Sequence, residues 1–147
     1  MSNRRGFRAL AERALAICSR CERPASLLFI DLDGFKPIND EFGHEEGDRA
    51  LHGMAQHLLE SFRESDVIGR IGGDEFCVLL ADASDPKVPM LRLEQRLSAW
   101  CETRPYELGF SVGMVHFEPE HHGTVADLMR EADGRMYESK RARSLAR

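Results

Sequence analysis

The sequence predicts a mixed α/β (α+β) fold in which a mixed or largely antiparallel sheet is covered by helices. The chain has 147 residues, of which 42% are hydrophobic, and this suits one domain with a single core. Helical and extended patterns alternate along it, and two extended segments follow each other around a Gly-Gly pair. A hairpin inside the alternation argues against an all-parallel, doubly wound sheet and favours antiparallel pairing.

The first half of the chain is expected to form a helix, a strand and a second helix. Apolar residues recur at helical spacing over residues 7–17, and Asn3 is suited to cap this helix. The short apolar run of residues 27–30 predicts a buried strand that ends at Asp31. Residues 51–62 carry the clearest amphipathic helical pattern.

The second half is expected to contain a hairpin, a helix, a strand and a final helix. Residues 67–71 and 76–81 are the two apolar strands of the hairpin. Ser84-Asp85-Pro86 predicts the start of a helix that reaches residue 100, with proline at its first position. Residues 110–114 alternate as a strand does, and residues 124–136 combine a capping box with an apolar helical stripe.

Composition and charge exclude several classes of partner. The 20 basic and 25 acidic residues give a net charge of −5, so no global basic field is present to attract duplex nucleic acid. No apolar run approaches the roughly 18 residues of a membrane span, and no signal peptide opens the chain, so we expect no membrane contact. Cys18 and Cys21 lack the second close pair of a zinc site, which favours reduced thiols and a cytoplasmic location.

The segment Gly72-Gly73-Asp74-Glu75 carries the strongest chemical signal. Two glycines can take positive φ at both central positions of a tight hairpin, which would hold the acidic pair at a rigid bend. Asp31 ends a buried strand, where a carboxylate is costly unless it is paired or bound to metal. Alone, Asp31 would be read as a turn cap; together with Asp74 it predicts a phosphate-bridged Mg²⁺ site.

Three further groups of residues offer polar or charged contacts to a ligand, and each also has a purely structural explanation. Asp48 can accept hydrogen bonds from the guanine edge and Asn39 can add an amide contact, although both residue types also cap turns. Arg63 and Asp66 offer a guanidinium and a carboxylate to a guanine or a phosphate, or form a common helix-end pair. Lys140 lies in a basic helix end that also suits the helix dipole.

These motifs, taken in order, resemble the GGDEF family of diguanylate cyclases. The segment of residues 70–76 matches the complete family signature, and residues 39–48 match its pattern N-D-x-x-G-H-x-x-G-D. Residues 29–40, Arg63-x-x-Asp66 and residues 131–140 match three further motifs, so that the resemblance extends from Asn3 to Lys140. It implies a nucleotidyl-cyclase-like fold with a central five-stranded sheet and the signature on a β-hairpin.

The resemblance implies condensation of two GTP molecules into cyclic di-GMP with release of two pyrophosphates, with Mg²⁺ or Mn²⁺ as cofactor. Asp31, Asp74 and the Leu32 carbonyl would hold metal, while Gly73, Asp74 and Glu75 would form the catalytic tip. Glu75 would be either the general base or an added metal contact. Arg63 and Asp66 would form a product-inhibition site. The residues expected to bind GTP are Phe35, Lys36, Asn39, Asp48, Lys140 and Arg143.

Two departures from the family pattern bear on function. Ser144 stands where the family has a phosphate-contacting arginine, so either Arg143 would substitute from one position earlier or this contact would be lost. The start of the chain matches only the end of the family's opening motif, so residues 1–147 are expected to be one GGDEF domain of a larger, membrane-anchored or soluble, signalling protein with sensor domains. Turnover would require a homodimer. Two alternatives remain: a non-catalytic receptor for GTP or cyclic di-GMP, and a structural dimerisation module.

Overall fold

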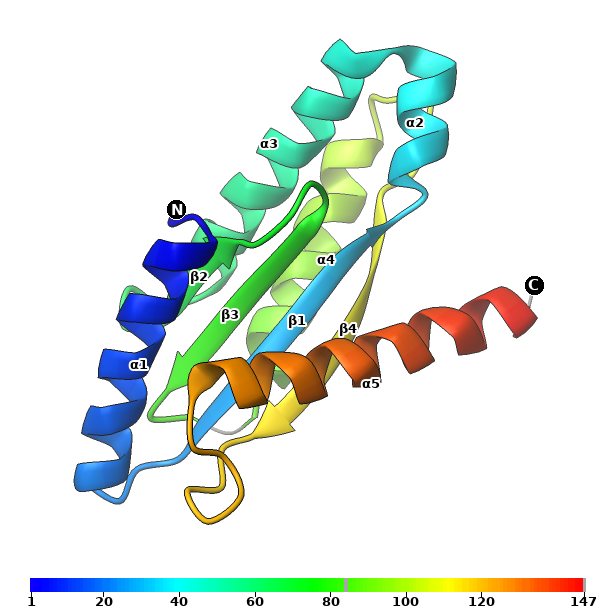
Figure 1. The fold of residues 1–147 in the computed structure, drawn as a ribbon. Helices are drawn as coiled ribbons and strands as arrows, with labels where there is room; N and C mark the ends of the chain where they lie inside the picture. The colour runs from blue at the N-terminus through cyan, green and yellow to red at the C-terminus, as the bar shows by residue number, and fades with distance from the viewer. Residues whose placement is uncertain (84, 147) are drawn as a thin grey trace.

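The computed structural model describes residues 1–83 and 85–146, and within them four strands form one sheet in the order β2–β3–β1–β4 (Figure 1). Every neighbouring pair of these strands is antiparallel, as the hairpin predicted. The strands are β1 (Ala25–Asp33), β2 (Val67–Arg70), β3 (Glu75–Ala81) and β4 (Gly109–His116). The helices are α1 (Arg4–Arg20), α2 (Phe35–Phe42), α3 (His44–Ser61), α4 (Lys87–Cys101) and α5 (Val125–Ala146).

The expectation of a five-stranded sheet is wrong for the described part of the chain, which has four strands. At the outer edge of β2, Ser2 forms a single bridge to Gly69. Asn3 then caps α1, its side chain accepting a hydrogen bond from the Gly6 N–H at 2.9 Å. Because the chain turns into a helix at once, the pairing begun at Ser2 cannot extend into a fifth strand.

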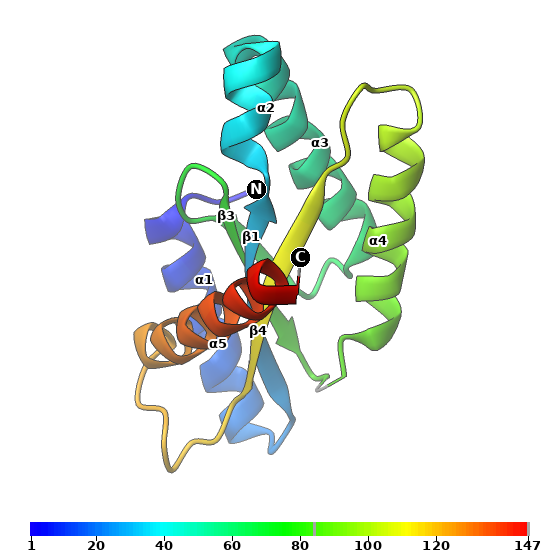
Figure 2. The ribbon, with the colours of Figure 1, turned by 90° about the vertical axis from the view of Figure 1, so that its right-hand side faces the viewer.

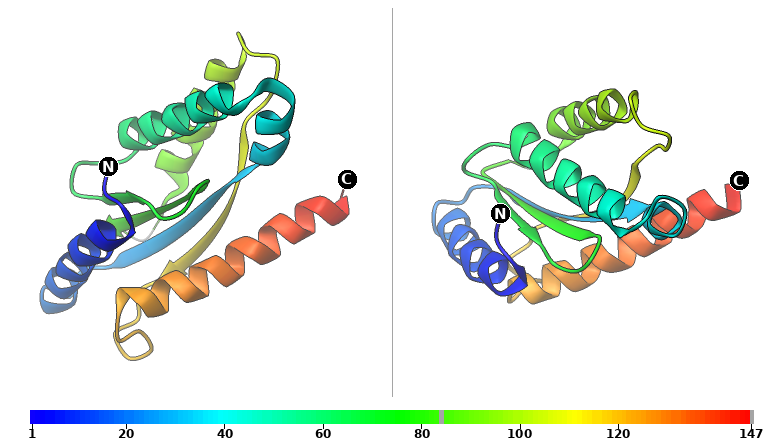
Figure 3. Two further views of the ribbon diagram at one scale, coloured as in Figure 1. Left: turned by 45° about the horizontal axis from the view of Figure 1, so that its top comes forward. Right: turned by 90° about the horizontal axis from the view of Figure 1, so that it is seen from above.

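Helices cover both faces of the sheet, α1 and α5 on one face and α3 and α4 on the other (Figures 2 and 3). Successive side chains of a strand point to opposite faces, and β1 follows this rule. Leu28 and Ile30 pack with α3 and α4, whereas Leu27 and Phe29 pack with α1 and α5. The fold is therefore three-layered, with one apolar core on each side of the sheet.

Gly113 in β4 sets the position of α5. A Cβ atom added at this glycine would collide with the backbone of Ala132 and Met136, so helix and strand approach without an intervening side chain. This close contact fixes the helix that carries Lys140. None of the described helices has both the length and the apolar character that a bilayer crossing requires.

Two boundaries differ from the sequence prediction. Pro86 is the N-cap of α4 rather than its first residue, and Asp85 accepts a hydrogen bond from the Lys87 N–H at 3.0 Å. Ser84, which was also predicted to start this helix, lies outside the described residues. The helix α2 was not predicted at all, and α3 begins at His44 rather than near residue 51.

Candidate active site

The end of β1 and the tip of the β2–β3 hairpin bring the predicted acidic residues together. Asp31 is paired with Glu75 across the β1–β3 ladder. The Leu32 N–H donates a hydrogen bond of 3.1 Å to the Asp74 carbonyl, which ties the hairpin tip to β1. The sequence therefore placed Asp31, Leu32, Asp74 and Glu75 correctly beside one another, through the antiparallel pairing of two neighbouring strands.

The hairpin tip is wider than predicted. The Ile71 N–H donates to the Glu75 carbonyl at 2.8 Å, which leaves residues 71–74 as the connection. A connection of this length does not need a mirror-image turn, and the prediction of positive φ at Gly72 and Gly73 is wrong, since neither has one. The role of Arg70 was not predicted: its guanidinium donates a hydrogen bond of 2.7 Å to the Gly73 carbonyl and so stabilises the tip.

Steric room explains the two glycines better than turn geometry does. A Cβ atom added at Gly72 would lie 2.5 Å from the Glu75 carboxylate oxygen Oε1, so any side chain there would displace Glu75. A Cβ atom added at Gly73 would meet no atom within 4 Å, so open space borders this residue. Gly72 therefore makes room for Glu75, and Gly73 leaves the approach to the acidic residues unobstructed.

The negative charge of the acidic cluster, Asp31, Asp74 and Glu75, is only partly neutralised by neighbouring cations. Lys140 Nζ lies 2.8 Å from Asp31 Oδ2, whereas the buried Asp31 Oδ1 has no hydrogen-bond partner among the described residues. Burial, reinforced by Asp31, raises the pKa of Asp74. Burial also raises the pKa of Glu75, with further contributions from Asp31, Asp133 and Asp74. A cation placed among these carboxylates would thus be stabilised.

The donor set fits a divalent cation that takes its remaining ligands from elsewhere. Within residues 1–83 and 85–146, no three His, Cys, Asp or Glu side chains form a metal-binding group. Asp31 and Asp74 nevertheless supply two carboxylates, and the unpartnered Asp31 Oδ1 is an oxygen available for coordination. Mg²⁺ is commonly held by one or two carboxylates together with water and substrate phosphates, and these residues suit that arrangement.

The predicted guanine contacts lie on the corner between α2 and α3. Asn39 is in α2 and Asp48 is in the second turn of α3, with Gly43 at the corner at φ 90°. A side chain at Gly47 would collide with the Asn39 amide, so the two helices meet closely at this point. The structure therefore brings Asn39 and Asp48 to one corner, beyond the end of β1 that carries the acidic cluster.

The first turn of α2 carries Phe35 and Lys36. Gly34 precedes it at φ 73° in the left-handed region and provides no side-chain cap to the helix. The first N–H groups of a helix lack intrahelical partners and attract anions, so this uncapped end is open to a phosphate. Lys36 is exposed beside it, and Phe35 is half-buried.

The end of α5 places Lys140 and Arg143 along the same face of β1. Asp31 and Asp33 are two residues apart on the strand and so share a face. Arg143 Nη1 lies 2.8 Å from Asp33 Oδ2 and donates a 2.6 Å bond to the Phe110 carbonyl. Burial lowers the pKa of Lys140, but the hydrogen bond and charge of Asp31 outweigh it and the net pKa is raised. Both cations are therefore tied to acidic residues of β1.

Arg63 and Asp66 lie at the turn between α3 and β2, away from the acidic cluster. The Asp66 side chain is 1% exposed, and it accepts hydrogen bonds from the Arg63 N–H at 2.9 Å and the Ala81 N–H at 3.3 Å. The Arg63 side chain is 56% exposed and its Nη2 lies 3.5 Å from Asp66 Oδ1. The two predicted inhibition-site residues are thus in contact, with Arg63 facing solvent and Asp66 facing the turn.

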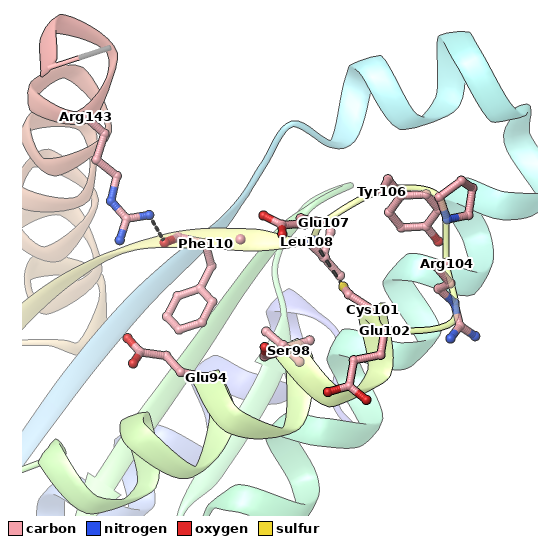
Figure 4. Close-up of a pocket in the computed structure, with 13 residues that line it drawn as sticks. Glu94, Ser98, Cys101, Glu102, Arg104, Tyr106, Glu107, Leu108, Phe110 and Arg143 are labelled. Atoms are coloured by element: carbon pink, nitrogen blue, oxygen red, sulfur yellow. Dashed lines mark hydrogen bonds between the residues drawn. The ribbon is translucent and has the colours of Figure 1, made fainter.

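A cavity of about 800 Å³ lies between α4, the α4–β4 loop (residues 102–108) and the end of α5 (Figure 4). Cys101 and Phe110 are in its wall, and Arg143 reaches it from α5. Of the residues predicted to bind GTP, metal or product, Arg143 is the one that lines it among the described residues. This cavity is therefore separate from the acidic cluster.

The sequence matches the family model "Diguanylate cyclase, GGDEF domain" over residues 1–145. It is 36% identical to the probable diguanylate cyclase DgcC of Escherichia coli K12 in an alignment of 144 residues that covers 95% of this chain and 38% of DgcC. It is 37% identical to the diguanylate cyclase TpbB of Pseudomonas aeruginosa UCBPP-PA14 in an alignment of 150 residues that covers 96% of this chain and 34% of TpbB.

Solved structures agree with this match. The GGDEF domain of TpbB from Pseudomonas aeruginosa superposes with a TM-score of 0.82 at 33% identity, covering 97% of this chain and 91% of the solved one. A microbial GGDEF domain studied with cyclic di-GMP superposes with a TM-score of 0.79 at 35% identity, covering 95% and 88%. The chain belongs to the GGDEF family, and it spans about a third of the length of the curated relatives it matches.

Proposed function

We propose that this domain is a diguanylate cyclase, which condenses two GTP molecules into cyclic di-GMP and two pyrophosphates. The observation that carries the proposal is the cluster of Asp31, Asp74 and Glu75, with an unpartnered carboxylate oxygen on Asp31 and Lys140 at its edge. Membership of the family supports it, as does the cyclic di-GMP ligand of a similar GGDEF domain.

The reaction is an in-line attack of a ribose 3′-hydroxyl on the α-phosphorus of a second GTP, with pyrophosphate as leaving group. Mg²⁺ (or Mn²⁺), held by Asp31, Asp74 and the Leu32 carbonyl, would neutralise phosphate charge and lower the pKa of the hydroxyl. Glu75 lies at the tip, and its raised pKa suits a base that accepts the hydroxyl proton. Its other role would be as a further metal contact.

GTP would lie between the α2–α3 corner and the acidic cluster. Asp48 would accept hydrogen bonds from the guanine edge, and Asn39 would add an amide contact. The uncapped start of α2, with Phe35 and Lys36, would take part of the triphosphate. Lys140 and Arg143 line the same face of β1, and phosphate binding would draw them from Asp31 and Asp33.

Each domain carries one such site, so cyclisation requires two copies that present their nucleotides to each other.

We also propose that the product, cyclic di-GMP, inhibits the domain by binding at Arg63 and Asp66. The exposed Arg63 guanidinium would contact a guanine or phosphate of cyclic di-GMP, while Asp66 holds the turn that presents it.

The test is incubation of concentrated domain with GTP and Mg²⁺, followed by chromatographic measurement of cyclic di-GMP. We expect Asp74→Ala to lower the rate at least about a hundredfold, because it removes a carboxylate from the site of charge development. Asp85→Ala, a change at an exposed aspartate near α4, is the control and should leave the rate unchanged.

The opposite results are equally informative. Full activity of Asp74→Ala would remove Asp74 from the catalytic site. Wild-type protein that binds GTP without forming cyclic di-GMP would replace the enzyme proposal with the receptor function. Wild-type protein that binds neither GTP nor cyclic di-GMP would favour the third function, a structural dimerisation module.

A further inference from the structure

Tyr106, on the α4–β4 loop, contacts both helices of the α2–α3 corner. Its hydroxyl donates a hydrogen bond of 2.6 Å to Glu46 Oε1 in the first turn of α3. Its ring lies 5.4 Å from the ring of Phe42, the last residue of α2, between centroids. Figure 1 shows this corner projecting beyond the end of the sheet. Tyr106 therefore supplies a contact to the corner from the α4–β4 loop.

The loop that carries Tyr106 is itself firmly supported. Arg104 stacks on Trp100 with its guanidinium carbon 3.4 Å from the ring centroid, and it donates a 2.8 Å bond to the Trp100 carbonyl. The Leu108 N–H donates to Cys101 Sγ at 3.2 Å, a bond drawn in Figure 4. Trp100 packs so closely on Gly53 of α3 that an added Cβ atom would lie 2.8 Å from its ring. Tyr106 is therefore presented from a fixed base.

The corner also carries the two proposed guanine contacts. Asn39 lies one turn before Phe42, and Asp48 lies two residues after Glu46. Gly47, adjacent to Glu46, is the residue that meets the Asn39 side chain. The angle between α2 and α3 thus sets the distance between the amide of Asn39 and the carboxylate of Asp48.

We propose that Tyr106, through its bond to Glu46, is a positioning residue for guanine recognition. This inference rests on the proposed function, because it assumes that Asn39 and Asp48 bind the base. Glu46 falls on an open position of the family pattern N-D-x-x-G-H-x-x-G-D, so the pattern itself gives this residue no role. Tyr106 acts through the corner and does not touch the nucleotide.

The test compares binding of two ligands by Tyr106→Phe and Glu46→Gln. One ligand is the α,β-methylene analogue of GTP, which cannot lose pyrophosphate; the other is tripolyphosphate, which has no base. Both are measured with Mg²⁺ by calorimetry. Glu45→Gln is the matched control, since Glu45 is the exposed neighbour in the same helical turn.

We expect each Tyr106 or Glu46 variant to weaken the GTP analogue about three- to tenfold, the usual effect of one hydrogen bond, with tripolyphosphate binding unchanged. The double variant should bind no worse than the weaker single variant. Unchanged binding of the GTP analogue, or an equal loss of both ligands, overturns the positioning role. If Tyr106→Phe does not fold, Glu46→Gln decides the question, with Arg49→Gln measured beside it to account for the 2.8 Å ion pair between Arg49 and Glu46.

Failure of the underlying function would show differently. Wild-type protein that binds the GTP analogue no better than its adenine counterpart would refute guanine recognition itself. Wild-type protein with a clear guanine preference that Tyr106→Phe and Glu46→Gln both retain would refute only the role of Tyr106.

Discussion

Asp74 and Glu75 hold their carboxyl groups where ionisation is unfavourable. Burial and neighbouring carboxylates raise the pKa of both groups in the folded protein. The folded state therefore binds more protons than the unfolded chain over a pH window that begins near the ordinary carboxyl pKa of about 4 and ends above the raised values. The free energy of unfolding therefore falls as the pH rises through this window. Ionisation of Asp74 and Glu75 thus destabilises the fold.

Replacing Asp74 with asparagine should make this loss visible. We expect Asp74→Asn to melt at a higher temperature than wild type at pH 7 without metal, because the variant removes one of the repelling charges. The difference should shrink as the pH falls toward the ordinary carboxyl pKa of about 4, because the raised pKa of Asp74 favours its neutral form in the folded protein. Scanning calorimetry from pH 4 to 8 measures this, with Asp85→Asn as control. Parallel pH curves for Asp74→Asn and wild type would contradict it.

At the scale of elements, the turn between α3 and β2 combines a buried residue, Asp66, with an exposed one, Arg63. Asp66 is buried and accepts hydrogen bonds from the Arg63 N–H within the turn and from the Ala81 N–H at the end of β3. Arg63 projects from the same turn into solvent and donates to the Ala81 carbonyl at 2.9 Å. The conformation of the turn thus depends on Asp66, and the surface it presents depends on Arg63.

This division predicts different outcomes for two substitutions. Arg63→Ala should relieve inhibition by cyclic di-GMP with little change in stability, since the lost guanidinium is exposed. Asp66→Asn should lower the free energy of unfolding by about 1–3 kcal/mol, because a buried acceptor of backbone N–H groups is replaced. Inhibition curves and urea unfolding measure the two effects. An unaltered inhibition curve for Arg63→Ala would exclude this site as the one that binds product.

The sequence predicted those elements whose apolar pattern is strong. The strands, the helices α1, α4 and α5 and the part of α3 from Leu51 onward follow from periodicity, and the meeting of Asp31 and Asp74 follows from hairpin pairing. The helix α2 was missed because Ile38 is its one fully buried residue and Pro37 interrupts its pattern. The contact of Arg143 with Asp33 could not be predicted, since it depends on how α5 crosses β4.

At the scale of the whole molecule, the proposed function makes one domain only half of a cyclising catalyst. The acidic cluster, the α2–α3 corner and the cations of α5 lie at one end of the sheet and make up the single proposed nucleotide site. A product with two phosphodiester bonds requires two such sites to face each other, and holding two reactants in register accounts for much of the rate.

The rate per domain should therefore depend on protein concentration. We expect the specific activity to rise with concentration in the dilute range and to level off where dimers predominate, because turnover requires two loaded copies. Initial rates over a hundredfold range, together with sedimentation velocity, measure this. A constant specific activity from a protein that sediments as a monomer throughout would disprove the need for a dimer.

The contact between Gly113 and α5 has a consequence for how accurately Lys140 is placed. Side chains between a helix and a sheet set the distance between the two backbones, and substitutions among them shift the helix. Here the backbones meet directly, so nothing soft separates β4 from the helix near Ala132 and Met136. The helix continues without a break from Met136, and Lys140 lies one turn further along it. The position of the Lys140 ammonium group relative to β1 thus depends on the contact at Gly113, a residue without a side chain.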